Sequence, residues 1–188
     1  MSTAGLDPRD YGVGADEPLL PAMTGTATFS PDGLYRYDLT RHWGDEGEAV
    51  CLWVMLNPST ADATKNDQTI SRCIYYSIRE GFGGLAVCNL YAYRATQPGD
   101  LLKAGAAARG PDNEATIEDW LERPAVTACV CAWGATKLTG LPPRPDVEIM
   151  ANRAQGVGVR LLCLGRTRNG QPKHPARLGN DAPLMPWP

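Results

Sequence analysis

Apolar residues fall into short runs separated by stretches with helical spacing. Runs at 49–56, 85–92, 128–133 and 160–164 are almost continuously apolar, which is typical of strands covered on both faces. Helices are predicted over 67–80, from a cap at Asp112 to a stop at Pro124, and over 145–155. These strand–helix–strand units predict a three-layer α/β/α sandwich with a central, mainly parallel four-stranded sheet.

A β-hairpin is predicted ahead of these units, from segments 24–29 and 34–40 around a turn at 30–33. Its alternation puts Tyr35, Tyr37 and Leu39 on one face and Arg36 and Asp38 on the other. Residues 1–23 are predicted to be an N-terminal arm on the surface, and 24–188 a single domain. Its last part, 165–188, is rich in proline and is predicted to be loop-like.

Composition narrows the classes of function. The 188 residues carry a net charge of −3, which argues against strong non-specific DNA affinity. No apolar run approaches the roughly 18 residues that span a bilayer, so we expect a cytoplasmic protein without a membrane partner. Six cysteines lie mainly in apolar runs without a C-x-x-C pair, which indicates small core residues. Phosphate-loop signatures and zinc spacing are missing, so neither a cofactor nor a metal is expected.

Polar residues stand where the predicted strands end. Asn57-Pro58 follows the first strand, Asn89 interrupts the second, Trp133-Gly134 ends the third, and His174-Pro175 lies in the loop after the fourth. Ligands of parallel sheets bind outside the carboxyl ends of the strands, so we expect Asn57, Asn89 and His174 to meet at one pocket. A buried Asn89 needs partners for its donor and its acceptor, and a base edge supplies both. A neutral His174 can donate to a developing anion.

Each of these signals has a structural alternative. Asn-Pro commonly starts a turn, an amide at a strand end can cap backbone groups, Trp133 can be core, and a loop histidine is usually solvated. Asp67 and Thr69 suit the first turn of a helix. Arg72, one turn further on, either binds a phosphate or pairs with Asp67.

The order of the motifs resembles the uracil-DNA glycosylase superfamily, over about residues 49 to 178. The corresponding segments are Met55-Leu56-Asn57-Pro58-Ser59, Val87-Cys88-Asn89-Leu90, Ala132-Trp133-Gly134-Ala135 and His174-Pro175-Ala176-Arg177. They are similar to the superfamily's G-I-N-P motif, asparagine strand, W-G-x-x-A element and H-P-S-P loop. Met55 stands where that family has its first glycine, and Ala176 and Arg177 replace the serine and second proline.

More closely, the chain resembles an uncharacterised bacterial and phage family known only as a domain of unknown function. The segments that carry this resemblance are 56–62, Asp67-x-Thr69-x-x-Arg72-Cys73, 89–94, 132–134 and His174-Pro175. It covers most of the chain and implies no established activity.

The glycosylase resemblance implies a base flipped out of its strand, with Asn89 reading its Watson–Crick edge. The catalytic residues would be Asn57, which orients the attacking water, and His174, which stabilises the departing base. The substrate-binding residues would be Pro58, Ser59, Asn89, Tyr91, Arg94, Trp133, Gly134, Arg72 and Arg177. The expected partner is DNA or a nucleotide, in DNA repair or modification. Two alternatives stay open: a non-catalytic nucleobase- or nucleic-acid-binding module, and an enzyme acting on free nucleotides or nucleosides. The sequence does not predict the oligomeric state.

Overall fold

The apolar runs form neighbouring parallel strands. A computed structural model describes residues 23–135 and 147–187, and in it β3 (Val50–Met55) lies between β4 (Gly84–Asn89) and β5 (Val126–Cys131), with β6 (Arg160–Cys163) beyond β5. All six residues of β3 and all six of β4 are buried, as expected for strands with helices on both faces. The predicted N-terminal arm falls outside the described residues, apart from Met23.

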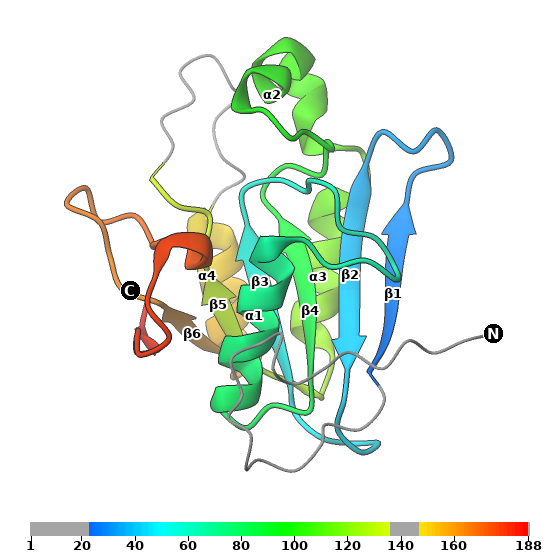
Figure 1. Cartoon of the computed structure of the whole chain (residues 1–188). Coiled ribbons are helices and arrows are strands. Elements are labelled where there is room, and N and C mark those ends of the chain that lie inside the picture. The colour runs from blue at the N-terminus through cyan, green and yellow to red at the C-terminus, as the bar shows by residue number, and fades with distance from the viewer. Residues whose placement is uncertain (1–22, 136–146, 188) are drawn as a thin grey trace.

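The sheet is larger and more mixed than the predicted four-stranded sheet. Within residues 23–135 and 147–187 it has seven strands, in the order β1-β2-β4-β3-β5-β6-β7. Figure 1 labels the first six of them. The hairpin of β1 (Thr24–Phe29) and β2 (Arg36–His42) is part of this sheet, because β2 pairs antiparallel with β4. The short β7 (Met185–Pro186) pairs antiparallel with β6. Pairing with β2 satisfies the backbone of β4, which would otherwise be an open edge.

One helix and the C-terminal segment cover the first face of the sheet. Helix α1 (Gln68–Arg79) buries Ile70, Cys73 and Ile74 against Trp53 and its neighbours, at the predicted helical spacing. The Asp67 side chain accepts from the backbone N–H of Ile70 at 2.9 Å, so Asp67 caps the helix as its position predicts. In Figure 1 this helix lies in front of the strands, with the C-terminal segment beside it.

The opposite face carries α3 (Asn113–Glu122) and α4 (Val147–Gly156). Asp112 stands at the N-cap of α3, but its side chain makes no capping hydrogen bond. The sequence pattern did not predict helix α2 (Pro98–Ala104) or the 3₁₀ turn η2 (Gly105–Arg109). Both lie at the end of the molecule where β3 and β4 finish (Figure 1). A further 3₁₀ turn, η3 (Pro175–Arg177), falls in the segment predicted to be loop.

The prediction that Arg36 shares a face of the hairpin with Asp38 is wrong, because Arg36 contacts Ala61 under α1 while Asp38 accepts from Trp120 of α3. Arg36 and Arg41 are both only 2% exposed, because the loop 61–66 covers their side of β2. The six cysteines are buried and form no disulfide, in agreement with the sequence interpretation. In the described parts of the chain, every helix is too short or too polar to cross a bilayer.

Candidate functional site

The carboxyl ends of the parallel strands finish level with one another. Met55 of β3 pairs with Asn89 of β4, and Val54 pairs with Cys131 of β5, which pairs with Cys163 of β6. The loops that carry Asn57, Trp133-Gly134 and His174 therefore all leave the sheet at the same edge as Asn89. The topology brings together strand ends that are far apart in the sequence.

Asn89 is a buried amide with an unused donor. Its side chain is 1% exposed, and its Nδ2 has no hydrogen-bond partner among the described residues. Along β4, Leu85 and Val87 pack on the α1 face, so alternation directs the Asn89 side chain to that face as well. A buried donor left unpaired costs about 1–3 kcal/mol, so a ligand that accepts a hydrogen bond from this Nδ2 would recover that free energy on binding.

Met55 lies beside Asn89 on the same face. It is buried, and its Sδ is 3.9 Å from Cys73 Sγ of α1. The side chain that replaces the motif's glycine is thus directed into the core under α1.

His174 is a neutral donor at the same edge. Its Nδ1 accepts from the backbone N–H of Ala176 at 3.3 Å, so the proton of the neutral ring is on Nε2. Burial lowers the pKa of His174, although the nearby carboxylate of Asp67 acts in the opposite direction. Gly134 has φ +74°, and a Cβ built there would be 3.4 Å from the Cβ of His174, so the two loops lie in contact. Because η3 packs on α1, His174 belongs to the α1 face, as Asn89 does.

Asn57 joins two loops. Its Nδ2 donates to the carbonyl of Pro58 at 3.0 Å and to that of Ala95 at 2.8 Å, and the backbone N–H of Ala95 donates to the carbonyl of Pro58 at 3.0 Å. Both amide hydrogens are therefore used within the protein. What Asn57 can offer a ligand is its Oδ1, which is an acceptor.

Ser59 and Arg94 line a cavity of about 400 Å³ between the hairpin turn and these loops. Thr60, Thr96 and Asp100 also line it, so polar and apolar groups both form its walls. Arg94 is held in place, because its Nη1 donates to the carbonyl of Gly33 at 3.1 Å and its guanidinium lies 4.9 Å from the centre of the Phe29 ring. This cavity opens beside the Asn57 loop.

Trp133 and Tyr91 are core residues. Trp133 is 1% exposed, its Nε1 donates to Gln171 Oε1 at 3.0 Å, and its ring packs edge-on against Trp187. Tyr91 is 2% exposed. These side chains hold the site loops on the sheet, and the core interpretation of Trp133 fits the structure.

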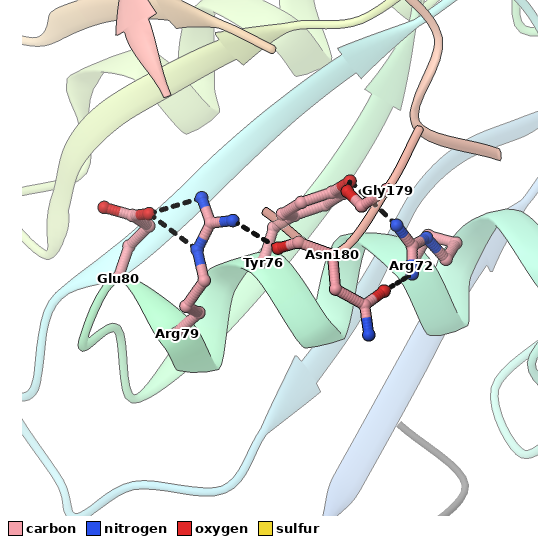
Figure 2. Close-up of polar contacts among 6 residues, drawn as sticks. All are labelled: Arg72, Tyr76, Arg79, Glu80, Gly179 and Asn180. Carbon is pink, nitrogen blue, oxygen red and sulfur yellow. Dashed lines mark hydrogen bonds and ion pairs between the residues drawn. The ribbon is translucent and has the colours of Figure 1, made fainter. Parts of the chain in front are cut away.

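Arg72 fastens the C-terminal segment to α1 and does not pair with Asp67. It donates to the carbonyl of Leu178 at 2.6 Å, to Tyr76 Oη at 2.8 Å and to Oδ1 of Asn180. Tyr76 and Arg79 continue this row by donating to the carbonyls of Gly179 and Asn180, each at 2.7 Å (Figure 2). The row anchors the chain just after η3 and so fixes the loop of His174. Arg177, by contrast, is exposed near His174 and lowers its pKa slightly by charge repulsion.

Arg36 and Asn113 are two residues that sequence reasoning missed. Arg36 Nη1 donates to the carbonyl of Ala61 at 2.9 Å, while its buried Nε has no partner in the described chain. Asn113 Nδ2 donates to the carbonyl of Asn89 at 2.8 Å and supports the end of β4 from the other face. For Arg36 the alternation pattern pointed to the face of Asp38, and for Asn113 no local signal distinguishes it from an ordinary first-turn residue.

Fold and site define a mixed α/β protein whose buried polar side chains gather at the carboxyl edge of its parallel strands. The chain belongs to the family described as protein of unknown function (DUF1643), whose model matches residues 36–176. The match includes Arg36, Asn57, Asn89 and His174, and it ends just before Arg177. Comparisons with curated proteins and with solved structures gave no match.

Proposed function

We propose that this protein binds a nucleobase in DNA and excises it by hydrolysis of the N-glycosidic bond, in the manner of the uracil-DNA glycosylases it resembles in motif order. The observation that carries the proposal is the buried Nδ2 of Asn89, which has no partner in the part of the chain that the structure describes. A flipped base that presents a carbonyl oxygen would satisfy this donor. Support comes also from the Nε2–H of His174, which stands on the same face of the same sheet edge.

His174 and Asn57 act on different steps of the proposed base excision. The electron pair of the C1′–N bond leaves with the base, which departs as an anion, and the Nε2–H of His174 stabilises the negative charge on its oxygen. Water adds to C1′ and releases a proton that finally neutralises the base. Asn57 Oδ1 accepts a hydrogen bond from that water. An amide is no general base, so the reaction rests on leaving-group stabilisation and is slow.

The test is base release from oligonucleotides that carry uracil, mismatched bases or hypermodified bases, followed by alkaline cleavage at the abasic site. We expect cleavage with at least one substrate, and loss of it in H174A and N57A. The matched control is N152A, since Asn152 is exposed on α4, away from the site.

Absence of release from every substrate, with specific base binding retained, would leave a non-catalytic nucleobase-binding module. Absence of both release and binding would refute the proposal.

A further inference from the structure

Two arginines on the same strand are buried to the same extent but are used differently. Arg41 donates to Asn66 Oδ1 at 2.9 Å and to the carbonyls of Thr40 and Asp62, each at 2.6 Å. Arg36 makes a hydrogen bond to the carbonyl of Ala61, while its Nε is buried without a partner in the described residues. A buried guanidinium is costly unless its donors are satisfied. Arg41 is explained by the loop that it holds, and Arg36 is not.

The unused donor of Arg36 belongs to the same corner of the molecule as that of Asn89. The backbone N–H of Arg36 donates to the carbonyl of Ala92 at 3.0 Å, so the start of β2 lies along the chain that leaves β4. Its guanidinium contacts Ala61, which packs in the core under α1, and this is the face to which Asn89 points. Two buried N–H groups that have no partner among the described residues thus lie at one end of one face.

The charged groups that act on Arg36 are Asp67, Arg94 and Arg41, so positive charge exceeds negative charge around it and favours an anion. Burial lowers the pKa of Arg36 to about 10, against the opposing effect of Asp67, so the guanidinium is still protonated at neutral pH. Asp67 already accepts from the first turn of α1, and it also acts on His174. Arg177 adds a second positive charge near His174.

We infer that Arg36 is an anion-recognising residue of this site, and that the site takes a planar heterocycle whose oxygen carries negative charge. This inference rests on the proposed function for the identity of the site. In the proposed reaction, the glycosidic electron pair moves onto the departing base. The guanidinium of Arg36 and the amide of Asn89 then donate to its oxygens while His174 donates from the next loop. Arg36 is thereby predicted to favour the anionic base over the neutral one.

The test uses free ligands and needs no catalysis. Barbiturate is a pyrimidine that is anionic at neutral pH, and uracil is a neutral pyrimidine of similar shape. Isothermal titration of the full chain should give at least tenfold tighter binding of barbiturate than of uracil. R36M should bring this ratio close to one, and R36K should keep part of it. R160M, which removes an equal charge from an exposed arginine at the start of β6, at the other end of the sheet, should leave the ratio unchanged.

Thermal unfolding provides a second readout. Because Arg36 is incompletely paired, R36M should melt at or above the temperature of the wild type, whereas R41M should melt well below it. A lower melting temperature for R36M together with an unchanged binding ratio would make Arg36 structural and overturn the inference. So would failure of the wild type to prefer barbiturate, or to bind either ligand. If the ratio of barbiturate to uracil affinity depends on Arg36 but no oligonucleotide loses a base, the inferred anion site is supported and the proposed base excision is refuted.

Discussion

Replacement of Asn113 by aspartate tests how the end of β4 is supported. Asn113 is 3% exposed, and its Nδ2 donates to the carbonyls of Asn89 at 2.8 Å and of Leu90 at 3.3 Å. Aspartate has the same shape, but as a carboxylate it would bring negative charge against both carbonyl oxygens. N113D therefore changes hydrogen bonding and charge with little change in packing.

The magnitude follows from protonation. The unfolded chain releases the proton of an aspartate near pH 3.9, while the folded chain retains it because the ionised form is repelled and desolvated. Folding at pH 7 then costs up to about 4 kcal/mol, from about 1.4 kcal/mol for each of roughly 3 pH units. Loss of the weaker hydrogen bond adds about 1 kcal/mol. The favourable position of a carboxylate in the first turn of α3 returns only about 0.3–1 kcal/mol, so destabilisation wins.

The sign of the pH dependence is fixed by the raised pKa of the introduced carboxyl group. The N113D protein keeps its folding stability below the pKa that the carboxyl group has in the unfolded chain. It loses stability as pH rises from there toward the pKa of the same group in the folded chain. Urea unfolding, followed by tryptophan fluorescence between pH 4.5 and 7.5, should show N113D losing stability relative to the wild type as pH increases. N113A should be destabilised by about 2 kcal/mol at every pH, since it removes the donor without adding charge.

The matched control is N152D, which makes the same substitution at an exposed position of α4. Its profile should follow the wild type within about 0.5 kcal/mol. If N113D and N152D give parallel profiles, the amide of Asn113 does not support β4 in the way the geometry indicates.

Other predictions address the loop of His174. R72M removes the hydrogen bonds from Arg72 to Leu178 and Asn180, so it should lower the unfolding free energy by about 1–3 kcal/mol and speed limited proteolysis at 178–180. Unchanged cleavage would count against the anchoring role. Folding lowers the pKa of His174 below its ordinary value of about 6.5, so its stabilising contribution is present above that pH and lost as pH falls through the folded pKa. NMR titration should report this lowered pKa, and H174Q should flatten that part of the stability profile; a titration at or above pH 6.5 would contradict it. G134A should cost about 1–2 kcal/mol, because φ is +74° and the new Cβ meets His174, whereas G156A, in open space at the end of α4, should not destabilise.

Part of the site was predictable because it depends on strand ends. Asn89 comes directly after the apolar residues 85–88, so its burial was predictable, but the lack of a partner for its Nδ2 among the described residues was not. The tautomer of His174 was not predictable, since it is set by one backbone N–H two residues away whose geometry the turn η3 decides. The hydrogen bond from the Asn57 amide to the carbonyl of Ala95 was not predictable either, because Ala95 is 38 residues further along the chain.

The sequence by itself determined the elements whose cause is local. Continuous apolar runs predicted β3 and β4, and the position of Asp67 predicted the start of α1, because burial on both faces and capping act within a few residues. The tertiary structure alone decided that β2 extends the sheet, that Arg36 is buried beneath the loop 61–66, and that Arg72 holds a segment more than a hundred positions away. Alternation along a strand indicates which side chains share a face, but the chain that covers this face comes from elsewhere in the sequence. Burial of Arg36 therefore depends on long-range packing that no local pattern encodes.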